Sequence, residues 1–135
     1  MKERNREISL KLAELYVQML LIRRFEERLL ILFDEGKCSG TIHTYIGQEA
    51  NAVGIINHLN QADAIFSNHR SHGHYLTWTN DAYGLACEIL GKADGVCNGI
   101  GGSQHLFKKG FLSSGVQGSI VPVAAGVALA KKLNN

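Results

Sequence analysis

The stretch SNHRSHGHYL, residues 67–76, places three histidines and one arginine within ten residues and contains no carboxylate. Such a cluster suits three kinds of chemistry: a metal site, an acid–base catalyst or a binding site for an anion. A zinc site normally adds Cys, Asp or Glu ligands, which are missing here, and Arg70 would repel a cation. An arginine fork beside a histidine donor suits an oxoanion, so the sequence favours an anion held by His69 and Arg70.

The segment before this cluster must position it. Residues 62–66, ADAIF, form a short apolar run that predicts a buried strand. The cluster would then lie at the carboxyl end of that strand, which is the edge of open α/β sheets where ligands bind. We therefore expect a ligand site directly after residue 66.

Four other segments have the periodicity of helices. They cover residues 12–34, 47–59, 79–90 and 122–133. In the first, the charged run RRFEER predicts a solvated face with Arg23 and Glu27 paired one turn apart. Thr79 or Asn80 is the expected N-cap of the third helix and Gly91 its C′ residue. Pro122 suits the first position of the fourth.

A glycine-rich stretch separates the last two helices. Residues 91–118 hold eight of the fifteen glycines together with scattered apolar residues, which predicts an ordered, irregular loop that closes over something. Within it, GIGGSQH at 99–105 could offer backbone N–H groups to a phosphate, but it matches no established phosphate-binding pattern, and such a stretch is more often a flexible loop than a phosphate site.

Composition narrows the class of protein. The formal net charge of the 135 residues is +2, so no broad attraction to nucleic acid is expected. No apolar run is long enough to span a membrane, and the N-terminus lacks a secretory signal. Three cysteines without CxxC spacing are typical of reduced thiols, which favours a cytoplasmic location.

Several stretches together resemble a known family. They occur in the order YVQMLLIRRFEERL, HTYIGQEANAVGI, HRSHGHYL, GIGGSQHLF and GVQGSIVPVAAGVALAKKL. This ordered set is similar to the N-terminal part of the α subunit of thiamine-diphosphate-dependent 2-oxo acid dehydrogenase E1 components, which include the pyruvate, branched-chain and acetoin dehydrogenases. The resemblance implies an α/β thiamine-diphosphate-binding fold, of which residues 1–135 would form a mostly helical N-terminal part with few strands.

The resemblance also implies roles for individual residues. His69 and Arg70 stand where the family has a Tyr-Arg pair that contacts the cofactor diphosphate, so a histidine replaces the tyrosine. His43 matches a histidine that lies near the substrate. Gly115 and Gln117 match a segment that holds the aminopyrimidine ring through its main chain, with glutamine in place of valine. His72 is expected to have a structural role in holding its loop.

Further expectations concern partners and completeness. The family uses Mg²⁺ held by a GDG…N motif, pairs with an E1 β subunit and passes an acyl group to a lipoyl-bearing E2. After Asp94 this sequence has no acidic residue, so no metal ligand is assigned to it. We expect a part of an E1 α subunit acting on a 2-oxo acid, with pyruvate favoured, and inactive as an isolated chain. The alternatives are a non-catalytic remnant that only binds a partner, and a sugar-phosphate or nucleotide binder using Arg70 and the glycine-rich loop.

Overall fold

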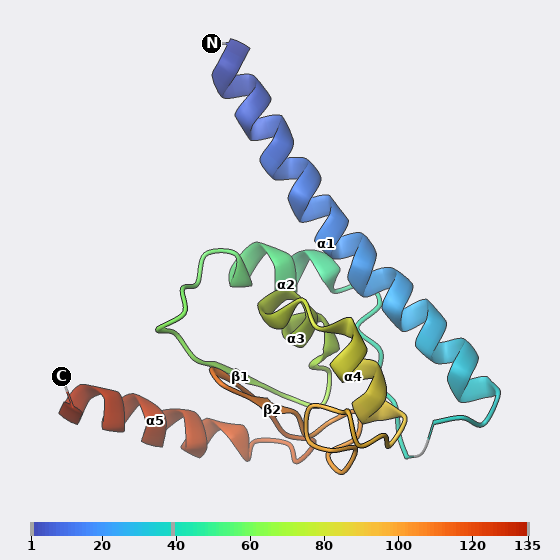
Figure 1. Ribbon diagram of the computed structural model, residues 1–135. Coiled ribbons are helices and arrows are strands. Elements are labelled where there is room, and N and C mark those ends of the chain that lie inside the picture. Colours follow the sequence, from blue (N-terminus) through green and yellow to red (C-terminus); the bar gives the residue numbers. More distant parts are fainter. Residues whose placement is uncertain (1, 39, 135) are drawn as a thin grey trace.

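The computed structural model describes residues 2–38 and 40–134. The described part of the chain folds into five helices and a small sheet of three strands (Figure 1). The elements in chain order are α1 Lys2–Asp34, α2 Glu49–Ile56, β1 Ile65–Ser67, α3 His72–Thr79, α4 Ala82–Ile89, β2 Phe107–Lys108, β3 Phe111–Ser113 and α5 Ile120–Asn134. The predicted predominance of helix with few strands is confirmed.

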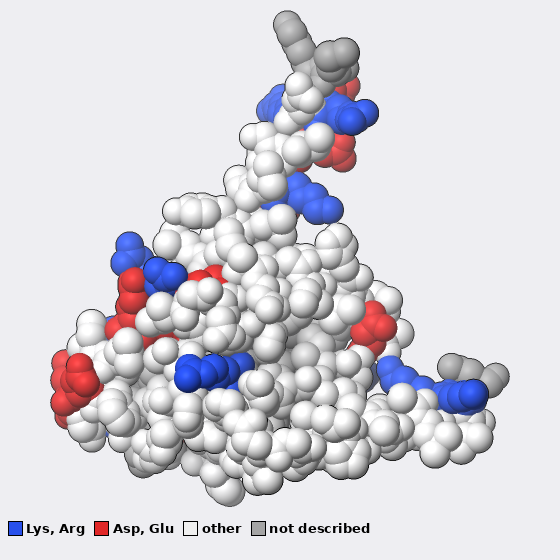
Figure 2. Space-filling view, turned by 180° about the vertical axis from the view of Figure 1, so that it is seen from behind, with Lys and Arg blue, Asp and Glu red and all other residues white. Residues whose placement is uncertain are grey.

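Helix α1 extends further toward the N-terminus than the apolar periodicity of its sequence predicted. It ends near residue 34 as predicted, with Gly36 in the left-handed region at φ 70°. It begins at Lys2, because the first ten residues are mostly good helix formers that need no burial. This N-terminal half projects beyond the body of the molecule (Figure 1). Figure 2 shows charged side chains gathered on that projecting end and further separate groups of charge on the body, with uncharged surface between them.

The core lies where the second half of α1 meets α2, α3 and α4. Its buried apolar residues are Ile22, Leu29, Tyr45, Ala52, Val53, Ile56, Tyr75, Leu76, Leu85, Ile89, Leu106 and Phe111. The apolar spacing that predicted this helix starts at Leu12, yet Leu12 and Tyr16 are 61% and 60% exposed, because this part of α1 lies outside the core. In α2 the inward face contains Ala52, Val53 and Ile56, whereas Ala50 is exposed.

The sheet is mixed and has the strand order β1-β3-β2. Strand β1 pairs with β3 in parallel, and β3 pairs with β2 in an antiparallel hairpin. The predicted strand at 62–66 is shifted, because Asp63 N–H donates to Asn60 O in a turn and the extended segment starts at Ile65. The stretch 91–118 was expected to be irregular, but it contains β2 and β3, which Gly110 joins at φ 81°.

Helix α3 begins within the histidine cluster, at His72, and was not predicted. Its sequence, HGHYLTWT, has few strong helix formers. Burial of Tyr75 and Leu76 stabilises it, and the hydroxyls of Thr77 and Thr79 donate to carbonyl groups four residues earlier. The histidines His72 and His74 therefore lie on a helix, whereas His69 and Arg70 lie in the loop that precedes it.

The ends of the last two helices also differ from expectation. Asp81 is the N-cap of α4, since its carboxylate accepts from Gly84 N–H at 2.8 Å, and neither Thr79 nor Asn80 has that role. Gly91 has φ 66° just past the end of α4, as predicted. Helix α5 starts two residues before Pro122, lies beside β1 at its near end and has no buried residue (Figure 1).

Across residues 2–38 and 40–134, no helix combines the length and the hydropathy needed to cross a bilayer. The cysteines Cys38, Cys87 and Cys97 are free thiols, as predicted from their number and spacing.

Candidate functional site

The site residues are positioned by two parallel strands. Strand β1 ends at Ser67 and β3 ends at Ser113, and the two residues are partners in the parallel ladder. The carboxyl ends of parallel strands meet at the same edge of a sheet. The loop with His69 and Arg70 and the loop with Gly115 and Gln117 therefore leave the sheet side by side.

His43 and His69 are in direct contact. Their ring centroids are 4.8 Å apart, and the rings are inclined at 84° to each other. On its other side, His69 Nδ1 lies 2.9 Å from the amide nitrogen of Gln117. These contacts join the segment before α2, the loop after β1 and the loop after β3 in one cluster.

Arg70 is held at the edge of this cluster. Its Nη1 donates to Thr44 O at 2.7 Å, next to His43 in the chain, and its backbone N–H donates to Asn68 Oδ1 at 2.9 Å. The bond to Thr44 uses one of the five N–H donors of a guanidinium, so the side chain is fixed in place with donors to spare. Within the described residues, the hydrogen bonds of His43, His69 and Arg70 include none to a carboxylate.

Gly115 meets the same cluster through Gln104, a residue that the sequence analysis did not single out. A Cβ atom at Gly115 would lie 2.2 Å from Gln104 Oε1, so only glycine fits there without displacing the glutamine. Gln104 Nε2 in turn lies 3.4 Å from His43 Nδ1. The one signal in the sequence was its place in GIGGSQH, as the amide side chain that follows the glycines. All five predicted site residues are therefore brought together.

The glycine-rich loop is organised around a carboxylate of the chain itself. Glu88 is fully buried, and its Oε2 accepts from Cys97 N–H at 2.6 Å and Gly99 N–H at 3.0 Å. Its Oε1 accepts from Gly101 N–H at 2.7 Å and Gly102 N–H at 3.1 Å. The idea that these backbone groups cradle a phosphate is wrong, because Glu88 already occupies them. The option of a nucleotide or sugar-phosphate binder loses this part of its basis.

A second buried network ties α1 to the same loop. His72 and Glu26 are both fully buried, with His72 Nδ1 2.9 Å from Glu26 Oε1. His72 Nε2 lies 2.9 Å from Ser103 Oγ in the glycine-rich loop. His72 thus has a structural role, as predicted. RRFEER is not a uniformly solvated face, since Glu26 is inside and Arg23 pairs with Glu49 at 2.7 Å instead of with Glu27.

The electrostatics of the cluster favour an anion. Burial, with the nearby His69, Arg70 and His72 adding to it, lowers the pKa of His43. An anion placed among these bases would offset their mutual repulsion. His74 has a different environment, since its ring bonds to Tyr45 Oη at 2.9 Å and Ser67 Oγ at 2.8 Å. Burial lowers the pKa of His74, which favours its neutral form.

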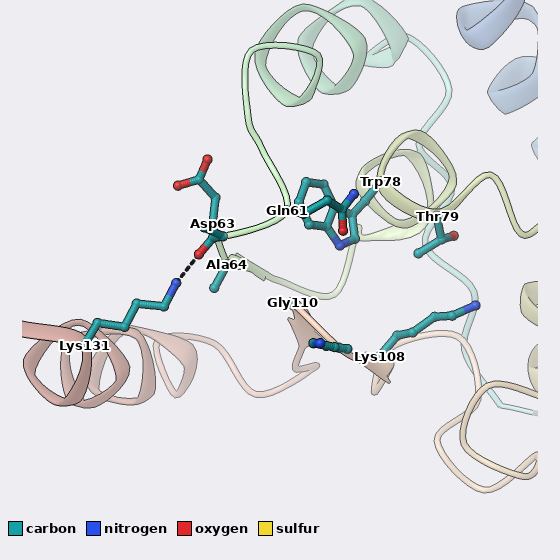
Figure 3. A pocket seen from close by; sticks show the side chains of 10 residues that line it. Gln61, Asp63, Ala64, Trp78, Thr79, Lys108, Gly110 and Lys131 are labelled. Atoms are coloured by element: carbon teal, nitrogen blue, oxygen red, sulfur yellow. Dashed lines mark hydrogen bonds between the residues drawn. The ribbon is translucent and has the colours of Figure 1, made fainter. Parts of the chain in front are cut away.

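A cavity of about 530 Å³ lies at the opposite end of β1 (Figure 3). Its wall includes Trp78, Gly110 and the side chains of Lys108 and Lys131. These two ammonium groups are already engaged, because Lys108 pairs with Asp81 at 2.7 Å and Lys131 donates to Ala62 O. Because its lining includes none of His43, His69, Arg70, Gly115 and Gln117, the cavity is separate from the basic cluster that the sequence indicated.

No group of three or more His, Cys, Asp or Glu side chains among the described residues is arranged to hold a metal ion.

Comparison with known proteins identifies the family. Residues 17–135 match the family described as Dehydrogenase E1 component. The α subunit of acetoin:2,6-dichlorophenolindophenol oxidoreductase from Cupriavidus necator is 44% identical over 124 residues, which cover 90% of this chain and 37% of the relative. The pyruvate dehydrogenase E1 component subunit alpha of Zymomonas mobilis is 43% identical over 129 residues, which cover 93% of this chain and 36% of the relative.

The chain therefore belongs to the dehydrogenase E1 component family, and the resemblance read from its motifs is confirmed. It spans little more than a third of the length of these relatives, 37% and 36%.

Proposed function

We propose that this chain is part of an E1 α subunit that binds thiamine diphosphate and takes part in the decarboxylation of a 2-oxo acid. The observation that carries the proposal is the meeting of His43, His69, Arg70, Gly115 and Gln117 at the carboxyl edge of β1 and β3. These five positions were assigned from motifs that lie as much as 74 residues apart, from 43 to 117. Their convergence supports a single binding site.

The basic groups suit the diphosphate of the cofactor. Arg70 offers a planar fork of donors, and His69 offers a further ring nitrogen beside it. The loop of Gly115 and Gln117 leaves the same edge, where its main chain would contact the aminopyrimidine ring. His43 packs against His69 in the same cluster, where it would orient the substrate. When bound, thiamine diphosphate supplies the carbon nucleophile that attacks the 2-oxo group and accepts the electrons left by departing carbon dioxide.

The magnesium ion of the family does not fit the residues described here. Mg²⁺ prefers oxygen ligands, usually including a carboxylate. The buried carboxylates Glu26, Glu49 and Glu88 are already bonded to His72, to Arg23 and to the glycine-rich loop, respectively. We therefore assign no metal ligand in this chain and derive no role through the ion.

The wider reaction follows from the family as a proposal. In an assembly with an E1 β subunit, the acyl group would pass to the lipoyl group of E2. We also propose a cytoplasmic location for this assembly. Pyruvate is the favoured substrate. The relatives named for acetoin and for pyruvate are nearly equal in identity, at 44% and 43%, so both substrates belong in the assay.

The decisive experiment removes the Arg70 guanidinium in an E1 assembly that contains this chain. Charge-assisted hydrogen bonds contribute roughly 1.5–3 kcal/mol, so Arg70→Ala should raise the dissociation constant of thiamine diphosphate roughly ten- to a hundredfold. Arg6→Ala, on the projecting and exposed end of α1, is the matched control and should leave affinity unchanged. Titration calorimetry measures both. Unchanged affinity in Arg70→Ala would favour the second candidate, a non-catalytic chain that only binds a partner.

A further inference from the structure

Gln104 links two acceptor atoms on the segment that carries His43. Its Nε2 lies 3.3 Å from Thr41 O and 3.4 Å from His43 Nδ1. The backbone of Gln104 is fixed independently, because its carbonyl accepts from Ser113 Oγ at 2.9 Å. The glutamine is thus anchored to the end of β3 and reaches across to the segment before α2.

The contact with Thr41 determines which end of the amide faces the histidine. A backbone carbonyl can only accept a hydrogen bond, so the amide atom beside Thr41 O must be the nitrogen. That nitrogen carries two hydrogens, one directed to Thr41 O and one to His43 Nδ1. His43 Nδ1 must therefore act as an acceptor, and an acceptor ring nitrogen carries no proton.

We propose that Gln104 is a positioning residue that fixes His43 as a neutral imidazole with its proton on Nε2. The Nε2–H group then becomes the one donor that the ring can present to a ligand in the cluster. The neighbourhood favours the same protonation state, since burial and the nearby His69 and Arg70 lower the pKa of His43.

The use of this donor in catalysis rests on the proposed function. A neutral imidazole whose Nε2–H is preset can donate to an oxygen of a 2-oxo acid and strengthen that bond as negative charge develops on the oxygen. The opposite tautomer would direct a lone pair at that oxygen and repel it. Gln104 would thus affect turnover through His43, without touching the substrate itself.

Gly115 has a part in this arrangement. A Cβ atom at Gly115 would lie 2.2 Å from Gln104 Oε1 and 3.2 Å from its Cβ. An alanine there should push the amide away from His43. Gly115→Ala is therefore a second way to break the contact without changing either partner.

The experiment reads the tautomer directly. The chain is labelled with ¹⁵N-histidine, the His43 signals are assigned by their loss in His43→Asn, and two-bond proton–nitrogen correlations show which ring nitrogen carries the proton at neutral pH. In the unmodified chain Nε2 should be protonated and Nδ1 bare. In Gln104→Met and in Gly115→Ala, the ratio of the Nε2-protonated to the Nδ1-protonated form of His43 should fall by roughly two- to tenfold, which is the effect of losing one ordinary hydrogen bond.

Two further variants complete the test. Gln104→Glu should place the proton of His43 on Nδ1 and raise the pKa of the ring, because a carboxylate can only accept. Gln18→Met is the matched control, since Gln18 bonds to Asn57 far from the cluster, and it should leave the His43 signals unchanged. A protonated Nδ1 or a tautomer mixture in the unmodified chain, or no change in Gln104→Met, would overturn the inference.

This readout is independent of the proposed function. It needs no cofactor, substrate or turnover, so a failure of Arg70→Ala to weaken cofactor binding would leave it intact. Conversely, finding the His43 proton on Nδ1 would overturn this inference without affecting the proposed role of Arg70. In an active assembly, Gln104→Glu should also move the pH profile of turnover toward higher pH, following the raised pKa of His43.

Discussion

Replacing Glu88 by glutamine tests what holds the glycine-rich loop in shape. The Glu88 carboxylate is fully buried and accepts four backbone hydrogen bonds, two on each oxygen. Glutamine keeps one oxygen and replaces the other by an NH₂ group. Two loop N–H groups then lose their acceptor and face another donor, whichever way the amide turns.

The expected loss of stability follows from these two bonds. A hydrogen bond to a charged group contributes roughly 1.5–3 kcal/mol, so Glu88→Gln should lower the free energy of unfolding by roughly 3–6 kcal/mol. The value should fall toward the lower end, because the loop residues are partly exposed and water can replace part of the contact. The whole free energy of unfolding of a domain is on the order of 5–15 kcal/mol, so the effect is large.

Urea denaturation followed by circular dichroism measures this change. Glu14→Gln, at an exposed position on α1, is the matched control and should change stability by less than about 0.5 kcal/mol. The loop also carries Gln104, so the His43 tautomer signals should change together with stability in Glu88→Gln. Equal unfolding curves for the two variants would refute the account of the loop as a shell around Glu88.

Two further predictions concern the core beneath the site. Gly73→Ala should lower the free energy of unfolding by about 1–3 kcal/mol or more, because the new Cβ atom would lie 2.2 Å from Tyr45 Cδ1. Gly54 is a helical position with open space around it, so Gly54→Ala should raise the free energy of unfolding by roughly 0.5–1 kcal/mol. Thermal denaturation of the two variants should therefore show changes of opposite sign. Burial lowers the pKa of His74 and contributes to the lowered pKa of His43, so the unfolded chain takes up protons near pH 6.5 while the folded chain does not. Stability should be full above about pH 6.5 and decline as pH falls through the folded pKa values, and urea titrations in which His74→Asn shows the same pH dependence as the unmodified chain would contradict this assignment.

Local pattern was sufficient for much of the fold. The apolar spacing of α1, the C′ glycine of α4 and the apolar run before the histidine cluster all led to elements that the structure contains. Helix α3 was missed because its residues have weak intrinsic helix propensity, and burial of Tyr75 and Leu76 outweighs that propensity. Strands β2 and β3 were missed because each is very short and lies among glycines.

Part of the candidate site could also be predicted from local sequence patterns. The types and spacing of His69 and Arg70 indicated an anion at a strand end, and the structure places both in the loop directly after β1. The motif positions of His43, Gly115 and Gln117 were known from the resemblance, but their meeting depends on the parallel pairing of β1 with β3. A strand of three residues gives too little pattern for that pairing to be predicted.

The sequence by itself determined which residue types are available: a basic cluster without acids, a glycine-rich loop, and helices with apolar faces. Only the tertiary structure decided which groups satisfy one another. Glu88 reads as an ordinary helical residue, yet it accepts hydrogen bonds from residues nine to fourteen positions further along the chain. Glu26 lies in a charged run, yet it is buried against His72, 46 residues away. Such pairings depend on how distant segments pack, because a buried polar group must find its partner wherever the fold brings one.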